Sequence, residues 1–180
     1  YDGTSAIMLS GETAMGKYPV LTVKTMSRIA ENAERTIHYD RRRVTRLEFQ
    51  NMHVSGDMKT LAISHATCAA AHDLNAAAVI TVSKSGMTGR MISKFRPLVP
   101  IIGCSPDEKV LRQMNLSWGV MPIYVEEKKS TDELFEAAVS AARQAGVIKD
   151  GDLTVITAGV PLGKSGTTNM MRIHVVGEPM

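Results

Sequence analysis

The chain has 180 residues, of which 44% are hydrophobic and 22% charged, and its formal net charge is +3. This composition is typical of a folded globular protein, and the length suits one ordinary domain with a smaller segment attached. The charge is too small to indicate nucleic-acid or membrane binding. The sequence has no stretch with the length of a transmembrane helix and no signal-peptide pattern, so we expect a cytoplasmic protein. Cys68 and Cys104 lie in apolar sequence and predict buried thiols in a reducing compartment.

The first 39 residues predict one strand and one helix. Ala6–Leu9 is a short apolar run, which is typical of a strand buried on both faces. Pro19 suits the first turn of a helix, and apolar residues then recur at helical spacing to about Tyr39. Because one strand and one helix cannot bury two apolar faces alone, we expect residues 1–39 to be the end of a larger α/β domain.

Residues 40–57 are polar and predict a linker. They include Arg41-Arg42-Arg43 and Arg46, but no aromatic side chain that could stack on a base lies among these arginines. We therefore interpret the arginines as a solvated face or a subunit contact, and not as a nucleic-acid site.

Residues 58–180 predict a compact domain in which helices and strands alternate. An alanine-rich helix ends by Asn75. The predicted strands are 77–83, 100–105, 120–125, 153–158 and 170–176, and the predicted helices between the first four are 88–96, 107–116 and 131–145. Ser130 and Glu133 match a capping box at the start of the last helix, and Gly146 is a plausible stop after it.

This alternation predicts a three-layer α/β/α fold with a five-stranded, mostly parallel sheet and right-handed crossovers. The last two strands are joined by a loop without a helix, so we expect the fifth strand to be an antiparallel edge. If the sheet is doubly wound, its strand order is 3-2-1-4-5.

The alanine-rich helix carries three possible metal ligands on one face. His65, Cys68 and His72 are spaced i, i+3 and i+7. A structural zinc site normally needs four ligands, and no fourth is evident in the sequence. We predict a packed interface at this face and no metal site.

A run of glycine, hydroxyl and basic residues follows the first predicted strand and precedes a helix. The first N–H groups of a helix have no intrahelical partner, and the helix dipole adds partial positive charge there, so such a turn can bind a phosphate. An ordinary capped turn is the alternative, since Ser and Thr are favoured helix caps. The candidate phosphate-binding residues are Ser83, Lys84, Ser85, Gly86 and Thr88.

A second loop of similar composition follows the fourth predicted strand, at 159–168. In a doubly wound sheet, ligands bind outside the carboxyl ends of the strands at the point where the strand order reverses, which is here between strands one and four. We predict that the two loops meet there around a phosphorylated ligand, with Lys164, Ser165 and Gly166 contributing. Residues 159–165 are one residue short of an ATP-binding P-loop, and the sequence after them is strand-like, so we reject that reading.

Two motifs resemble those of one enzyme family. The run Met8-Leu9-Ser10-Gly11-Glu12-Thr13-Ala14, followed by Gly16-Lys17-Tyr18-Pro19, closely resembles the end of the catalytic barrel of pyruvate kinases, with a bacterial character. The Ser83–Thr88 run and Gly166-Thr167-Thr168-Asn169 are similar to that family's C-terminal domain. The resemblance covers essentially the whole chain.

The resemblance implies a modular organisation. Residues 1–39 are then the eighth strand and helix of a TIM barrel, 40–57 a linker, and 58–180 an effector-binding domain that also makes contacts in a homotetramer. Ser10 and Glu12 fall at the edge of the parent active site, because such sites lie at the carboxyl ends of barrel strands. The parent reaction, from phosphoenolpyruvate and ADP to pyruvate and ATP in glycolysis, needs Mg²⁺ or Mn²⁺ and K⁺.

The family's essential lysine and its cation ligands come from earlier barrel strands that this sequence does not contain. We therefore expect no cofactor in this portion and no phosphotransfer activity from it without the barrel, although a fragment that retains activity is an alternative. A purely structural tetramerisation domain is another alternative.

The expected effector is a sugar phosphate or AMP. Animal and yeast members of the family hold the second phosphate of fructose 1,6-bisphosphate with a Trp and an Arg, and these positions align near Glu127 and Leu134. Since neither residue can play that part, a monophosphate such as AMP or ribose 5-phosphate becomes comparably plausible. Lys164 or Arg90 could supply the missing charge.

Overall fold

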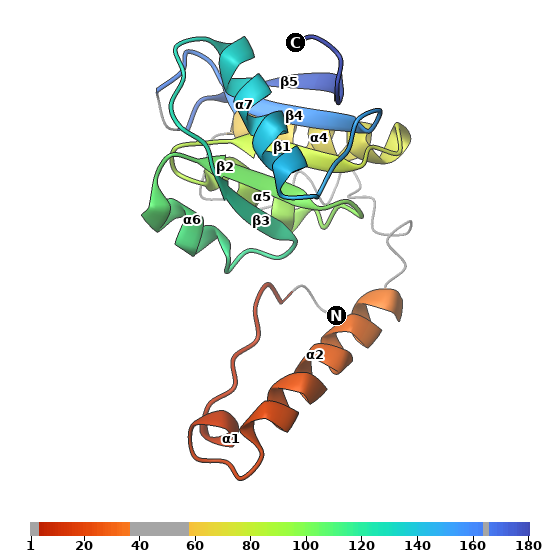
Figure 1. Cartoon of the computed structure of the whole chain (residues 1–180), viewed down its shortest axis with the longest axis vertical. Helices are drawn as coiled ribbons and strands as arrows, with labels where there is room; N and C mark the ends of the chain where they lie inside the picture. The colour runs from red at the N-terminus through yellow and green to blue at the C-terminus, as the bar shows by residue number, and fades with distance from the viewer. Residues whose placement is uncertain (1–3, 37–57, 164–165) are drawn as a thin grey trace. The chain divides into compact units, whose positions relative to one another are not determined.

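The computed structural model describes residues 4–36, 58–163 and 166–180 (Figure 1). The chain divides into two compact units, Tyr1–Arg43 and Val44–Met180. The predicted linker lies outside the described residues, so the domain boundaries at residues 39 and 57 stay predictions.

The first unit contains helix α1 (Gly11–Ala14) and helix α2 (Pro19–Thr36). Pro19 begins α2, as predicted, and the expected extension to Tyr39 lies outside the described residues. The strand expected at Ala6–Leu9 is wrong, because these residues have no regular secondary structure. A strand needs a partner for its N–H and C=O groups, and the described part of this unit offers no second strand.

The second unit is an α/β fold built on a five-stranded sheet. The strand order is β3-β2-β1-β4-β5, with β4 and β5 antiparallel and the other neighbours parallel. Both the order and the antiparallel last strand were predicted from the sequence. The elements are α4 (Met58–Asp73), β1 (Ala78–Val82), α5 (Met87–Lys94), β2 (Ile101–Ser105), α6 (Glu108–Met114), β3 (Val120–Tyr124), α7 (Thr131–Gln144), β4 (Leu153–Gly159) and β5 (Thr168–Val175).

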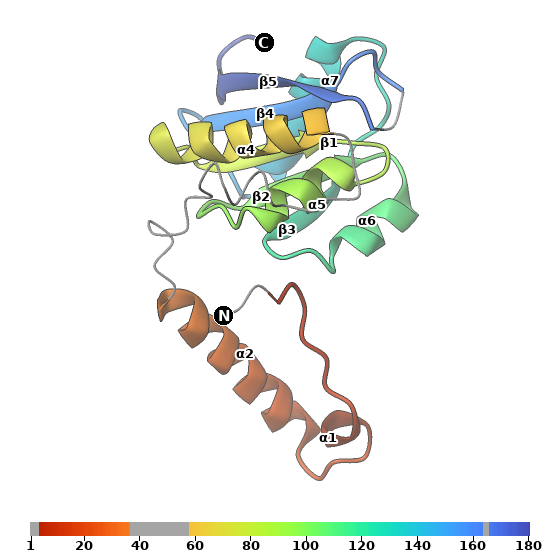
Figure 2. The same cartoon turned by 180° about the vertical axis from the view of Figure 1, so that it is seen from behind.

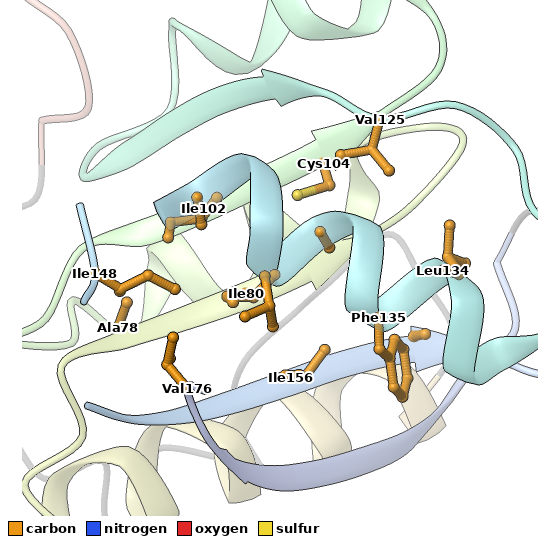
Figure 3. Close-up of a cluster of buried hydrophobic side chains, with 14 residues drawn as sticks. Ala78, Ile80, Ile102, Cys104, Val125, Leu134, Phe135, Ile148, Ile156 and Val176 are labelled. Carbon is orange, nitrogen blue, oxygen red and sulfur yellow. The ribbon is translucent and has the colours of Figure 1, made fainter. Parts of the chain in front are cut away.

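Helices cover both faces of the sheet. Helix α7 crosses one face (Figure 1), and α4 and α5 cover the other (Figure 2). On the α7 face, Ile80 of β1 pairs in register with Ile102 of β2 and Ile156 of β4, and all three are fully buried. Phe135 of α7 belongs to the same buried cluster (Figure 3). Because side chains alternate along a strand, the neighbouring residues supply the second core under α4 and α5.

The ends of α7 are fixed by local hydrogen bonds. The hydroxyl oxygen of Ser130 accepts a hydrogen bond from the backbone N–H of Glu133 at 3.2 Å, which confirms the predicted N-cap. Gly146 follows the helix with φ of +73°, and the N–H of Val147 donates back to the carbonyl of Ala142. This is the arrangement in which a glycine in the left-handed region ends a helix.

Neither cysteine forms a disulfide. Cys104 is buried and Cys68 partly so, and burial raises the pKa of each thiol to about 12. Among the helices that the structure describes, none is long and apolar enough to cross a membrane.

Candidate functional site

A pocket lies at the carboxyl ends of the parallel strands, where the loops after β1, β2, β3 and β4 meet. Parallel strands bring these four loops to one edge of the sheet, and the strand order reverses between β1 and β4. The described lining residues are Val82, Ser83, Lys84, Pro106, Val125, Glu126, Glu127, Lys128, Leu134, Ala158, Gly159, Leu162, Gly163, Gly166, Thr167 and Thr168. The loops after β1 and β4 thus meet at the predicted edge of the sheet, and ligand binding there stays a prediction.

The turn between β1 and α5 depends on Gly86. This residue is the N-cap of α5 and has φ of +68°, a conformation that residues with a Cβ seldom adopt. A Cβ there would also lie 2.9 Å from Cγ of Met114. Because glycine has no side chain, Gly86 provides no side-chain cap to α5, although its carbonyl accepts a hydrogen bond from the N–H of Arg90 at 3.1 Å.

A hydrogen bond joins the two predicted phosphate loops. The hydroxyl oxygens of Thr88 and Thr168 are 2.6 Å apart, and the two residues are only 1% and 5% exposed. Thr168 lines the pocket, whereas Thr88 and Ser85 are not among the described lining residues. Thr88 therefore holds the loops together from behind the pocket wall.

The other predicted phosphate ligands fall into two groups. Ser83, Lys84 and Gly166 line the pocket. Lys164 and Ser165 lie outside the described residues.

Two ion pairs border the pocket. Lys84 Nζ lies 2.5 Å from Glu127 Oε1, and Lys128 Nζ lies 3.3 Å from Glu126 Oε2. Lys84 and Glu127 come from different loops, after β1 and β3 respectively. In the sequence-based prediction Glu127 appears only through the resemblance, at a position aligned with a phosphate-holding residue of other family members. It is not among the predicted site residues, although the predicted parallel order brings the loop after β3 to the same edge of the sheet.

The loop after β4 is anchored by Asn169, which the sequence analysis quoted only as part of a motif. The side-chain Nδ2 of Asn169 donates to the carbonyl of Val160 at 2.7 Å, and its Oδ1 accepts from the N–H of Val160 at 2.9 Å. Gly159 lets the two ends of the loop approach closely, since a Cβ there would lie 2.8 Å from the backbone of Thr167. The strand β5 that follows confirms the rejection of a P-loop, which must open a helix.

Ser10 and Glu12, the predicted edge of a parent active site, lie in the first unit at the start of α1. The backbone N–H of Ser10 donates to Glu12 Oε2 at 3.0 Å. Hydrogen bonds from the backbone of Glu12 and then of Ser10 lower the pKa of this fully exposed carboxyl. The carboxylate therefore stays charged over the physiological range, but its contacts are local.

The histidine and cysteine face of α4 makes ordinary packing contacts. The ring of His65 lies 5.5 Å from that of Phe95, and His72 Nδ1 lies 3.2 Å from Asp73 Oδ1. Within the described ranges, no group of three or more His, Cys, Asp or Glu side chains could hold a metal ion.

Comparison with known proteins gives consistent matches. Residues 61–174 match the family described as "Pyruvate kinase, alpha/beta domain". The chain is 47% identical over 176 residues to a pyruvate kinase of Clostridium acetobutylicum, covering 98% of this chain and 36% of that protein. Pyruvate kinases of Staphylococcus epidermidis and Staphylococcus aureus are 45% and 44% identical over 183 residues, covering 99% of this chain and 30% of those proteins. The chain thus spans about a third of the length of these curated relatives.

Proposed function

The chain belongs to the pyruvate kinase family and contains its C-terminal alpha/beta domain, and on that premise we propose that it binds a phosphorylated effector and regulates a longer pyruvate kinase. The observation that carries this proposal is the pocket where the loops after β1 and β4 meet. A pocket at this point of a doubly wound sheet is where such folds bind ligands.

The chemistry of the pocket favours a phosphate group. Lys84 supplies a positive charge and Ser83 a hydroxyl, and both line the pocket beside the start of α5. The partial positive charge of a helix N-terminus stabilises an anion close to it. Gly163 and Gly166 have φ of +88° and +78°, a conformation that favours glycine. Because glycine has no side chain, the loop opposite Lys84 leaves room for a ligand at these two points. We propose a sugar phosphate or AMP as the effector.

The test is the thermal stability of the purified chain with inorganic phosphate, ribose 5-phosphate, glucose 6-phosphate, AMP and fructose 1,6-bisphosphate. A ligand at a hundred times its Kd adds about 2.7 kcal/mol to the free energy of unfolding, which raises Tm measurably. We expect a selective shift that Lys84→Ala abolishes. Lys94→Ala is the control, since it removes a lysine from the last turn of α5, which does not line the pocket. A shift that persists in Lys84→Ala would contradict the proposed site.

One observation favours a second candidate function, a purely structural assembly domain. The hydroxyl of Thr88, predicted to bind phosphate, is already used in the hydrogen bond to Thr168. In that case the β1–α5 turn serves to join two loops of a subunit in a homo-oligomer. No shift in Tm with any ligand of the panel, for a chain with an intact fold, would favour this function over effector binding.

We further propose that phosphotransfer from phosphoenolpyruvate to ADP belongs to the longer protein, which we place in the cytoplasm as a homotetramer. Ser10 and Glu12 are then at the edge of its active site. The described residues contain no group of three or more His, Cys, Asp or Glu side chains that could hold the divalent ion of that reaction, so no step is assigned to a metal here. The purified chain should not convert phosphoenolpyruvate and ADP to pyruvate and ATP; measurable conversion would refute this.

A further inference from the structure

We infer that Glu127 determines the ligand specificity of the pocket. Its carboxylate forms an ion pair with Lys84 until a phosphate takes its place, and the displaced carboxylate then disfavours any ligand with a second phosphate. The ligand class is a hydroxylated monophosphate, such as a sugar monophosphate. This role rests on the phosphate binding proposed above.

The Lys84–Glu127 ion pair lies inside the pocket. Lys84 lies on the loop after β1 and Glu127 on the loop after β3, and both line the pocket, so the pair links two of its sides. Lys84 Nζ also lies 4.0 Å from the point where a Cβ on Gly163 would be, beside the loop after β4. The lysine therefore stands between the loops at the place proposed for the phosphate, and a carboxylate already neutralises it.

The Lys84–Glu127 ion pair is exposed enough to open readily. The side chains of Lys84 and Glu127 are 39% and 61% exposed. Ion pairs exposed to this degree contribute little to stability because water screens them. A phosphate can therefore take the place of the carboxylate on Lys84 without disturbing the fold. A phosphate monoester carries close to two negative charges, against one for the carboxylate, which favours the exchange.

The described charged side chains that line the pocket balance one another. Among its described lining residues, the charged ones are two lysines and two glutamates, and each lysine is paired with a glutamate. Both of these lysines are therefore neutralised before a ligand binds. After Glu127 leaves Lys84, its negative charge remains at the pocket and repels a further anion. Its oxygens can instead accept hydrogen bonds from hydroxyl groups of a sugar.

The remaining wall of the pocket suits such a ligand. Side chains of Val82, Val125 and Leu134 give it an apolar part. The pocket volume is about 70 Å³ with the ion pair closed, well below the roughly 300–1,000 Å³ of most ligand pockets. The exposed Glu127 side chain forms part of this wall, so its movement away from Lys84 widens the pocket on that side.

The experiment compares two ligands that differ only in the second phosphate, glucose 6-phosphate and glucose 1,6-bisphosphate. Their Kd values are measured by titration calorimetry on the wild-type chain, Glu127→Gln and Asp150→Asn. Asp150 is the matched control, because it also forms an exposed ion pair, with Arg143, but precedes β4 and so lies away from the pocket.

We expect Glu127→Gln to bind the bisphosphate about tenfold more tightly and the monophosphate about threefold more tightly, since one opposing charge is removed. Raising the salt concentration should shrink both gains. Asp150→Asn should leave the ratio of the two Kd values within about twofold of wild type. Glu127→Ser should behave as Glu127→Gln, which separates the effect of charge from that of the amide.

Two results would overturn the inference while leaving the proposed function standing. One is an unchanged ratio in Glu127→Gln when glucose 6-phosphate still binds, and the other is an equal change of the ratio in Asp150→Asn. If neither ligand, nor inorganic phosphate, binds to the folded wild-type chain or to Glu127→Gln, the proposed function fails and this role of Glu127 fails with it.

Discussion

The runs Ala6–Leu9 and Ala78–Val82 are both short and apolar, yet only the second is a strand. Ile7 and Met8 are 59% and 86% exposed, whereas every residue from Ala78 to Ile80 is fully buried. The difference lies in the neighbours, since β1 is hydrogen-bonded to β2 on one edge and to β4 on the other. An apolar run thus becomes a strand only where other strands pair with its backbone and helices cover its faces.

The same contrast extends to the helices of the two units. Helix α2 has no buried residue, and Val20, Leu21 and Ile29 on it are largely exposed. Helix α7 buries an apolar stripe against the sheet. Burying one large aliphatic side chain contributes about 1.5–3 kcal/mol, so matched substitutions in the two units should have very different effects on stability.

The largest expected difference is between two isoleucines. Ile156→Ala removes a fully buried side chain from the centre of the α7 face of the sheet and should lower the free energy of unfolding of the second unit by about 2–5 kcal/mol. Ile7→Ala removes a side chain that is mostly in water and should change it by less than about 0.5 kcal/mol. Urea unfolding measures both. Equal effects would show that residues 4–36 are packed against something in solution.

A smaller difference is expected between two threonine hydroxyls. Thr88→Ala leaves the buried hydroxyl of Thr168 without its partner and should cost about 1–3 kcal/mol. Thr22 also donates a hydrogen bond, to the carbonyl of Tyr18 at 2.9 Å, but this bond is exposed to solvent, and Thr22→Ala should be nearly neutral. Thermal unfolding followed by circular dichroism compares them. A neutral Thr88→Ala would contradict a structural role for the bond that joins the two loops.

The smallest expected difference is between two N-cap serines. Ser130 caps α7 through its hydroxyl, and Ser130→Ala should cost about 1 kcal/mol. Ser10 is the N-cap of α1 but makes no such side-chain bond, so Ser10→Ala should leave stability unchanged. The midpoints of urea unfolding report both changes. A cost at Ser10 similar to that at Ser130 would mean that α1 is capped in solution.

The strands and helices of the sheet domain could be predicted because short stretches of sequence indicate each of them. Runs rich in β-branched residues alternate with helical segments, and right-handed crossovers then allow few strand orders. The strand at Ala6–Leu9 was wrong for the complementary reason, since local sequence does not report whether a partner strand is present.

The site was predictable only in part. Strand ends and topology were enough to place Ser83, Lys84 and Gly166 at the pocket. They could not show that Thr88 already has a partner in Thr168, or that Glu127 reaches Lys84, because both contacts depend on side-chain positions across loops far apart in sequence.

The two hydrogen bonds between Asn169 and the backbone of Val160 have a consequence for how the domain can vary. They close a loop at its base, next to the pairing of Gly159 with Thr168, so the sheet ends at the same place whatever lies between. Lengthening a flexible loop costs little once its ends are held, about 0.6 kcal/mol for each doubling. We therefore expect the fold to tolerate insertions and exchanges in this segment, which makes it a natural place to graft new ligand preferences in protein engineering.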